Sequence, residues 1–115
     1  MSDSGYIDGK ILLQPTSRVT RKFYFPPAES ATAKGAIPYN TVVNSVVVTA
    51  YDVDGTDVTS LLISGTPSVA ANIVTVVLTY PTAWGEGRYK LSFKLTLNNT
   101  DIENFDFPGV QAKDV

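Results

Sequence analysis

Residues 89–98 alternate strictly between apolar and polar side chains, and this pattern constrains the fold more than any other feature of the chain. The run reads Tyr-Lys-Leu-Ser-Phe-Lys-Leu-Thr-Leu-Asn, so every odd-numbered residue is apolar and every even-numbered residue is polar. Successive side chains of a β-strand point to opposite faces of the sheet, so such a strand buries one face and leaves the other in water. The pattern predicts an antiparallel sheet that covers a core on one side.

Seven further segments carry strand signals. Residues 73–80 alternate cleanly, whereas residues 41–53 are rich in valine on both faces, which predicts a strand covered on both sides. The remaining strands are expected at residues 10–14, 19–25, 57–63 and 102–107, and residues 110–115 form a tail or a last edge strand.

Turn-forming residues separate these segments. Turns are expected at residues 52–55, 64–67 and 98–101, where Gly, Pro, Asn and Asp gather. Pro108 and Gly109 are expected to interrupt the last strand, because proline cannot donate to a ladder. Residues 28–40 are rich in Ala, Ser and Thr without a clear period, which predicts a long surface connection with room for one short helical turn.

The composition agrees with an all-β fold. Val, Ile and Thr make up 33 of the 115 residues, and β-branched side chains favour pleated surfaces over helices. The length suits one domain. We therefore expect a single β-sandwich of about seven or eight strands over residues 1–115, with N-terminal strands and a long loop in residues 1–40 and a valine-rich core in residues 41–115.

Several absences narrow the chemistry. The chain has no His and no Cys, which removes Ser-His and Cys-His pairs, the commonest metal ligand, thiolate zinc sites and disulfides. A net charge of −2 without a Lys/Arg cluster disfavours nucleic-acid binding. We find no signal-peptide pattern at Met1 and no apolar run long enough for a membrane span. Catalysis by carboxylates alone stays open in principle, but the acids fall in turns or on wet faces, so no enzyme activity and no cofactor are expected.

Four stretches carry a family resemblance. They are the valine-rich run at residues 42–53, Leu62-Ile63-Ser64-Gly65, Ile73-Val74-Thr75-Val76-Val77-Leu78, and Gly87-Arg88-Tyr89-Lys90-Leu91. With these stretches, residues 41–115 resemble an immunoglobulin-like domain encoded in the structural gene clusters of tailed phages and prophages. Bacterial surface Ig-like repeats share much of the pattern. The chain departs from it at residues 81–84, Pro-Thr-Ala-Trp, where the family often has a glycine pair.

The resemblance implies an immunoglobulin-like antiparallel β-sandwich with a structural role in a virion, at the neck, tail or fibre attachment, and no catalytic residues. Its partners would be other virion proteins, with self-association through edge strands as an option, and a small-molecule ligand is not expected. Assembly in the bacterial host cytoplasm fits a sequence that shows no export signal. The edge strands and the 28–40 loop are the expected points of contact.

Asp52, Asp54 and Asp57 place three carboxylates around Gly55. Calcium prefers several hard oxygen ligands on a turn, so this cluster is a candidate calcium site. The spacing does not match an EF-hand loop, which needs a third acid before the glycine and a distal Glu. The alternative is a hairpin turn in which Asp and Gly serve the backbone conformation alone.

Trp84 is the only tryptophan and lies in a loop flanked by Pro and Gly, near Tyr80. An exposed aromatic side chain on a loop can anchor a protein partner or stack on a sugar ring. This is the basis of a second functional hypothesis, a carbohydrate- or surface-binding Ig-like module that uses Trp84, Tyr80 and the neighbouring loops. The alternative is that Trp84 covers one end of the sandwich core.

Overall fold

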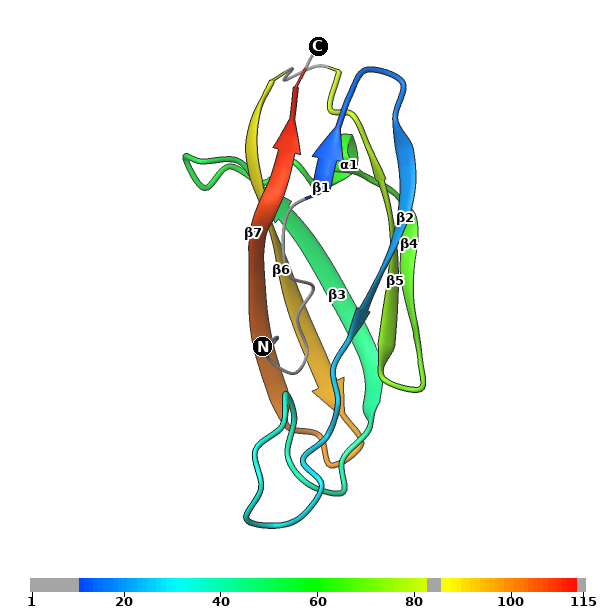
Figure 1. The fold of residues 1–115 in the computed structure, drawn as a ribbon, viewed down its shortest axis with the longest axis vertical. Helices are drawn as coiled ribbons and strands as arrows, with labels where there is room; N and C mark the ends of the chain where they lie inside the picture. Colours follow the sequence, from blue (N-terminus) through cyan, green and yellow to red (C-terminus); the bar gives the residue numbers. More distant parts are fainter. Residues whose placement is uncertain (1–10, 83–85, 114–115) are drawn as a thin grey trace.

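The computed structural model describes residues 11–82 and 86–113 and arranges them as two facing layers of strands (Figure 1). Seven strands and one helix of a single turn make up these layers. Their bounds are β1 Ile11–Leu13, β2 Arg18–Tyr24, β3 Val43–Tyr51, α1 Thr59–Leu62, β4 Ile63–Ala70, β5 Ile73–Thr79, β6 Gly87–Leu97 and β7 Ile102–Ala112. No helix in this part of the chain is long and apolar enough to cross a membrane.

The strands form a four-stranded sheet in the order β1-β7-β6-β3 and a three-stranded sheet in the order β2-β5-β4. Every pairing is antiparallel except that of β1 with β7, which is parallel. The predicted β-rich, two-layer architecture is therefore confirmed. The expectation of a wholly antiparallel sandwich is wrong, because β1 runs beside β7 in the same direction before the chain crosses to β2 in the other sheet.

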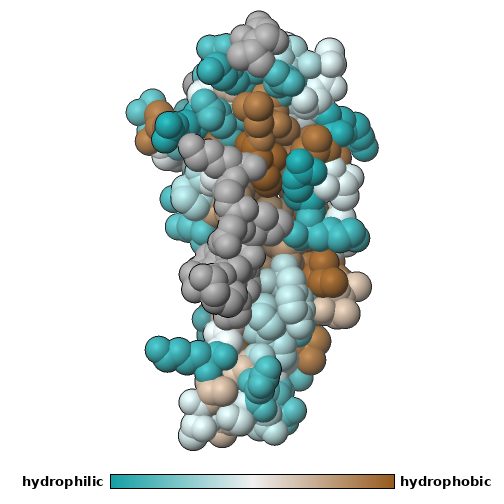
Figure 2. Space-filling model, in the orientation of Figure 1, coloured by the Kyte–Doolittle hydropathy of each residue, from teal (hydrophilic) through white to brown (hydrophobic). Residues whose placement is uncertain are grey.

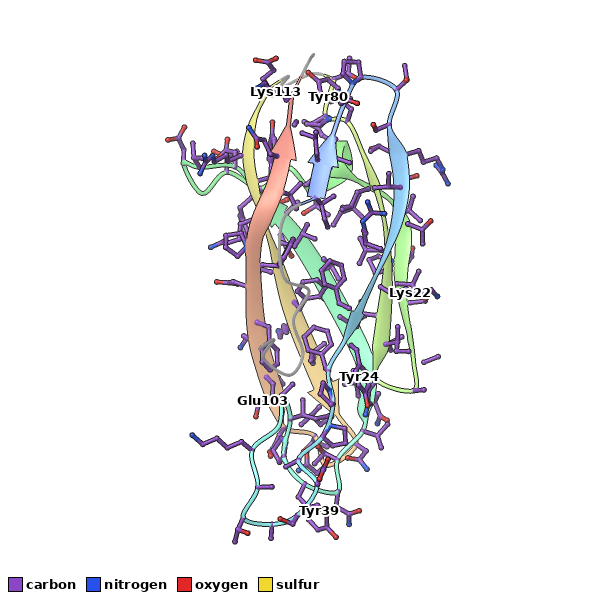
Figure 3. All side chains as sticks on the ribbon, viewed as in Figure 1. Lys22, Tyr24, Tyr39, Tyr80, Glu103 and Lys113 are labelled. Carbon is purple, nitrogen blue, oxygen red and sulfur yellow. The ribbon has the colours of Figure 1, made fainter. Side chains whose placement is uncertain are left out.

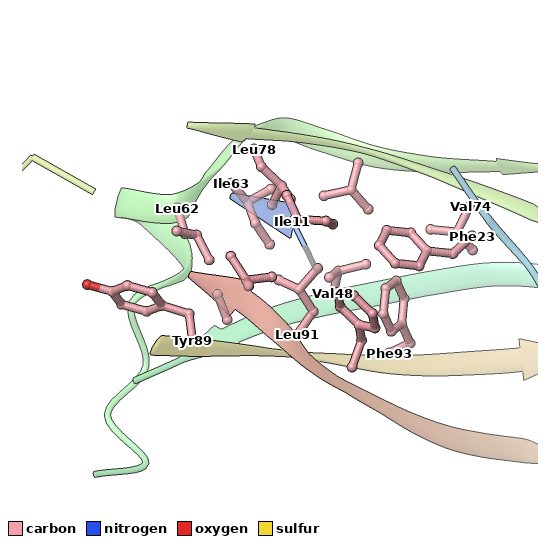
Figure 4. Close-up of a cluster of buried hydrophobic side chains, with 14 of the residues drawn as sticks. Ile11, Phe23, Val48, Leu62, Ile63, Val74, Leu78, Tyr89, Leu91 and Phe93 are labelled. Atoms are coloured by element: carbon pink, nitrogen blue, oxygen red, sulfur yellow. The ribbon is translucent and has the colours of Figure 1, made fainter. Parts of the chain in front are cut away.

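The core lies between the two sheets and is built by the alternating strands (Figure 4). In β6 the five odd-numbered residues from 89 to 97 are all buried, as the alternation predicts. In β5, Val74, Val76 and Leu78 are fully buried on the facing sheet. Phenylalanines join the layers, with ring centroids 4.8 Å apart for Phe23 and Phe93. Aromatic rings contribute both apolar area and specific geometry to such a core.

The strand predicted at residues 57–63 and the turn predicted at residues 64–67 are both wrong. Residues 59–62 form α1, because a single helical turn buries both Val58 and Leu62, which lie four residues apart. Residues 64–67 lie within β4, where the pairing with β5 jumps from Ser64 to Ser68. Gly65 has a φ of +73° within this irregular stretch. The glycine that suggested a turn therefore allows a β-bulge inside the strand.

The prediction that the valine-rich strand is covered on both sides is also wrong. β3 ends its sheet, and its side chains alternate between the core and the solvent. Val48 is 5% exposed, whereas its neighbour Val47 is 60% exposed. The run of valines reflects strand propensity on an outer face as well as burial, and composition alone does not separate the two.

Pro108 and Gly109 disturb the last strand without ending it. β7 continues through them to Ala112, and the register with β6 shifts between Tyr89 and Leu91. Two residues of β7 therefore oppose one residue of β6, which is the geometry of a bulge, where proline is tolerated. The expected interruption is wrong, and residues 110–112 belong to β7, where they pair with β1.

Candidate functional site

The long connection predicted at residues 28–40 forms a loop that projects from one end of the molecule (Figure 1). Its two ends are joined by the Ala28 N–H, which donates to the Ile37 carbonyl over 2.9 Å. Both residues are buried, so they fix the loop to the core. A Cβ atom on Gly35 would lie 2.4 Å from the Ala28 backbone, so only glycine allows this close approach.

A hollow of about 460 Å³ opens beside this loop. Its lining includes four alanines, and charge comes from Lys34 and from Glu103 at the start of β7. Tyr39, which is 51% exposed, lies at the same end of the molecule (Figure 3). A wide opening with small side chains and opposite charges can accept a side chain of a protein partner, and it lacks the enclosure that small-molecule sites usually have.

The predicted calcium cluster at residues 52–57 lies in the loop between β3 and α1, which projects sideways from the opposite half of the molecule (Figure 1). One oxygen of Asp52 accepts hydrogen bonds from the N–H groups of Asp54 and Thr56, both at 2.9 Å. One oxygen of Asp57 accepts the N–H of Thr59 at 2.9 Å and its hydroxyl at 2.6 Å. These bonds satisfy the backbone of a turn, as the alternative interpretation requires.

The three aspartates do not converge as a ligand set. Within residues 11–82 and 86–113, no group of three or more acidic, His or Cys side chains is placed to hold a metal ion. Asp52 and Asp57 instead stabilise the path from β3 into α1. The hydrogen bonds from the Thr59 hydroxyl and N–H lower the pKa of the Asp57 carboxyl from its usual 3.8.

The second functional hypothesis depends on Trp84 and Tyr80. Trp84 lies outside the described residues. Tyr80 is half-buried and packs against the core cluster, at the end of the molecule that also holds Lys113 (Figure 3). Nearby, burial raises the pKa of the Tyr89 phenol, and the charges of Asp52 and Tyr80 raise it further.

Another hollow, of about 230 Å³, lies beside Tyr89 and is also lined by residues 52–53, 88, 90 and 108. Arg88 and Lys90 supply its cations, and Asp52 supplies a carboxylate. The Lys90 ammonium lies 3.7 Å from a carboxylate oxygen of Asp106 and 5.5 Å from the centre of the Tyr51 ring. Both members of the ion pair are about half exposed, so the pair contributes little to stability.

A feature that the sequence analysis missed lies at β1. Leu12 is 49% exposed, and a hydrophobic patch covers this strand in the space-filling view (Figure 2). Its neighbours Ile11 and Leu13 are buried, so β1 contributes to the core as well as to the surface. Pro15 and Thr16 lie two and three residues after the strand, and this proline turn was the signal that could have drawn attention to the exposed face of β1.

Comparisons with known protein families and with curated proteins find no match to this chain.

Proposed function

We propose that this protein is a non-catalytic structural subunit of a phage or prophage particle, and that its fold is an immunoglobulin-like sandwich. Under this proposal it acts at the neck, tail or fibre attachment through contacts with other virion proteins, after assembly in the host cytoplasm. The strand order β1-β7-β6-β3 and β2-β5-β4 supports the Ig-like part of the proposal, and the resemblance of residues 41–115 to the Ig-like domains of phage structural gene clusters supports the virion role.

The strand order supports an Ig-like assignment by direct correspondence. In a constant-type Ig domain, strands A, B, E and D form one sheet and strands C, F and G form the other. Under this proposal β2, β5 and β4 would correspond to B, E and D, and β3, β6 and β7 would correspond to C, F and G. The first strand departs from the constant-type arrangement, because it lies beside the last strand, in the opposite sheet.

The position of Tyr89 adds a second line of support. Ig domains carry a tyrosine near the start of strand F, two residues before a buried position that is a cysteine in antibodies. Tyr89 lies near the start of β6 and is 4% exposed, and Leu91, two residues later, is completely buried. An apolar side chain at that position suits a chain that has no Cys.

The surface supports a role based on contact. The 28–40 loop is fixed at both ends and presents a wide hollow with Lys34 and Glu103, which can receive a partner's side chain. Preorganised loops of this kind lose less conformational entropy on binding.

The direct test uses the source strain. Its prophages are induced by DNA damage, and purified particles, particle-free medium and lysate are analysed by mass spectrometry. We expect this protein to be enriched in the particles. Detection only in the lysate would reject the virion role, and detection only in the medium would favour the exported surface-binding module.

A loop variant tests the contact site. Removing all of residues 28–40 would also remove the buried Ala28 and Ile37, so residues 29–34 alone are replaced by a short Ser-Gly linker. We expect normal folding and lost incorporation into particles. Val53→Ser, at the opposite end, is the matched control, because Val53 is 76% exposed and lies outside the loop. Equal incorporation of both variants would exclude the loop as a contact site.

The carbohydrate-binding hypothesis has its own test. A glycan array probed with the unmodified protein and with Trp84→Ala would show binding that the substitution abolishes. The hypothesis rests on two aromatic residues, Trp84 and Tyr80. Tyr80 is half-buried against the core, so the substitution is made at Trp84.

A further inference from the structure

We propose that two copies of this chain exchange β1, so that Ile11 and Leu13 of each copy fill the position beside β7 of the other. The inference rests on the contact role proposed above and identifies the partner as a second copy. Three observations support it: a strained turn after β1, the short apolar strand β1 itself, and the edge of β7, which β1 of a second copy can cover in the same way. Exchange of an identical element is a low-cost route to a dimer.

The strained turn joins β1 to β2. It runs from Gln14 to Ser17 and is closed by the Ser17 N–H, which donates to the Gln14 carbonyl over 2.8 Å. Pro15 occupies its second position and Thr16 its third, with a φ of +70°. A turn with Pro second and positive φ third favours Gly or Asn at the third position, and a β-branched residue there is strained.

Opening this turn would release the strain at Thr16. The residue before a proline already favours an extended backbone, so Gln14 and Pro15 suit a straight connection between β1 and β2. In the exchanged form the connection would cross from one copy to the other. Short, strained hinge loops are the ones that invite such exchange.

The exchanged element is small and apolar. β1 has three residues, paired in parallel with Val110, Gln111 and Ala112. Ile11 is 2% exposed and Leu13 is completely buried, and the Leu13 carbonyl accepts a hydrogen bond from the Lys113 N–H at 2.9 Å. A second copy can supply the same side chains and the same hydrogen bonds. The exchange therefore needs no docking surface beyond the one the single chain already has.

Thr100 is the useful comparison, because it is also a threonine with positive φ, at +73°. The strand beyond Thr100 is β7, whose eleven residues pair with both β6 and β1. Detaching β7 would dismantle the four-stranded sheet, whereas detaching β1 opens only three residue pairs. Strain at Thr16 can therefore be relieved by exchange, and strain at Thr100 cannot.

A disulfide trap tests the proposal, because the natural chain has no Cys. Leu12 and Gln111 are register partners across β1 and β7, so Leu12→Cys combined with Gln111→Cys places two thiols side by side. The double variant is refolded at increasing protein concentration, oxidised, and run on non-reducing gels. We expect covalent dimers whose share rises with concentration, since exchange joins residue 12 of one copy to residue 111 of the other.

The matched control is Thr96→Cys combined with Ile102→Cys, which are register partners across β6 and β7. This pair does not involve β1 and should close within one chain at every concentration. A second control relaxes the turn: Thr16→Gly should raise the dimer dissociation constant about a hundredfold, or roughly tenfold for each of the two hinges. Sedimentation or light scattering on the chain without cysteines measures that shift and does not depend on the disulfide.

Purely intramolecular disulfides in the Leu12/Gln111 variant at all concentrations would overturn the proposal. An unchanged association constant in Thr16→Gly would also overturn it, since the strained turn would then have no part in the dimer. Neither result bears on incorporation into particles, which the mass spectrometry measures separately. The virion role and the strand exchange can therefore fail independently.

Discussion

The four-stranded sheet has two edges, and they are held in place in different ways. β3 has nine residues and is fixed at both ends: the Val43 N–H donates to the Asn72 side chain, and the Ala50 N–H donates to the Thr59 hydroxyl, each over 2.9 Å. β1 has three residues and is followed directly by a turn that holds Thr16 in the left-handed region. Both edges nevertheless bury apolar side chains completely or nearly so.

This contrast teaches that burial and attachment are separate properties of an edge strand. β3 is tied to groups from the β4–β5 turn and from the start of α1, so leaving the sheet would expose several backbone groups at once. β1 is held by the apolar contacts of Ile11 and Leu13 and by its three-residue pairing with β7, all of which another copy can reproduce. An edge of the second kind suits exchange between subunits, and an edge of the first kind suits a permanent part of the fold.

The largest expected effect concerns the apolar contacts of β1. Leu13→Ala should lower the free energy of unfolding by about 3 kcal/mol, because the side chain is completely buried and its removal leaves a cavity. Leu12→Ala, on the exposed face of the same strand, should change it by less than about 0.5 kcal/mol. Urea unfolding curves measure both. Equal effects would show that β1 does not contribute to the core.

The next effect concerns the attachment of β3. Asn72→Ala should lower the free energy of unfolding by about 2 kcal/mol, because the buried Val43 N–H loses its acceptor. Asn72 also has a φ of +64°, so Asn72→Gly, which removes the acceptor without backbone strain, separates the two causes. Asn99→Ala is the control, because the Asn99 side chain accepts an exposed N–H from Asp101 and its loss should cost less. Amide exchange at Val43 should accelerate only in the Asn72 variants.

The other end of β3 gives a smaller expected effect. Thr59→Val keeps the shape of the side chain but removes the hydroxyl that accepts the Ala50 N–H and donates to Asp57. The expected loss in the free energy of unfolding is about 1 kcal/mol, the usual net value of the one part-buried hydrogen bond, because the bond to Asp57 is exposed and adds little. Thr56→Val, in the exposed loop, is the matched control. Identical melting temperatures for the two variants would argue against the anchoring role of Thr59.

The smallest expected effect is a dependence on pH at Asp57. Hydrogen bonds from Thr59 lower its pKa in the folded state, so the folded chain favours the ionised carboxylate. The ionised Asp57 carboxylate therefore contributes fully to the stability of the fold above the usual pKa of 3.8. That contribution is lost as the pH falls through the lowered pKa of the folded state. Melting temperatures recorded from about pH 6 to about pH 2 should fall less steeply for Asp57→Asn than for Asp54→Asn. Parallel curves for the two variants would show that Asp57 does not contribute to the loss of stability at low pH.

Local patterns predicted the elements that have one clear period. The alternation of β6 and of β5 identified both strands and their buried faces, because a period of two leaves only one side for the core. The Asp-Gly turn after β3 was also predictable, since Gly55 adopts a φ of +84° there. The segment from Val58 to Leu62 was wrongly predicted to be part of a strand, because a single helical turn is too short to show a helical period.

The sequence by itself determined that this protein is β-rich and that its core draws on alternating strands such as β6, because side-chain period and β-branched content are local properties. It also determined the chemistry that is absent from the chain, through the lack of His and Cys. Only the tertiary structure decided that β1 runs parallel to β7, that Asn72 fixes β3, and that Ala28 and Ile37 fix the long loop. Each of these depends on residues far apart in the chain, whose meeting is set by the packing of the two sheets rather than by any local pattern.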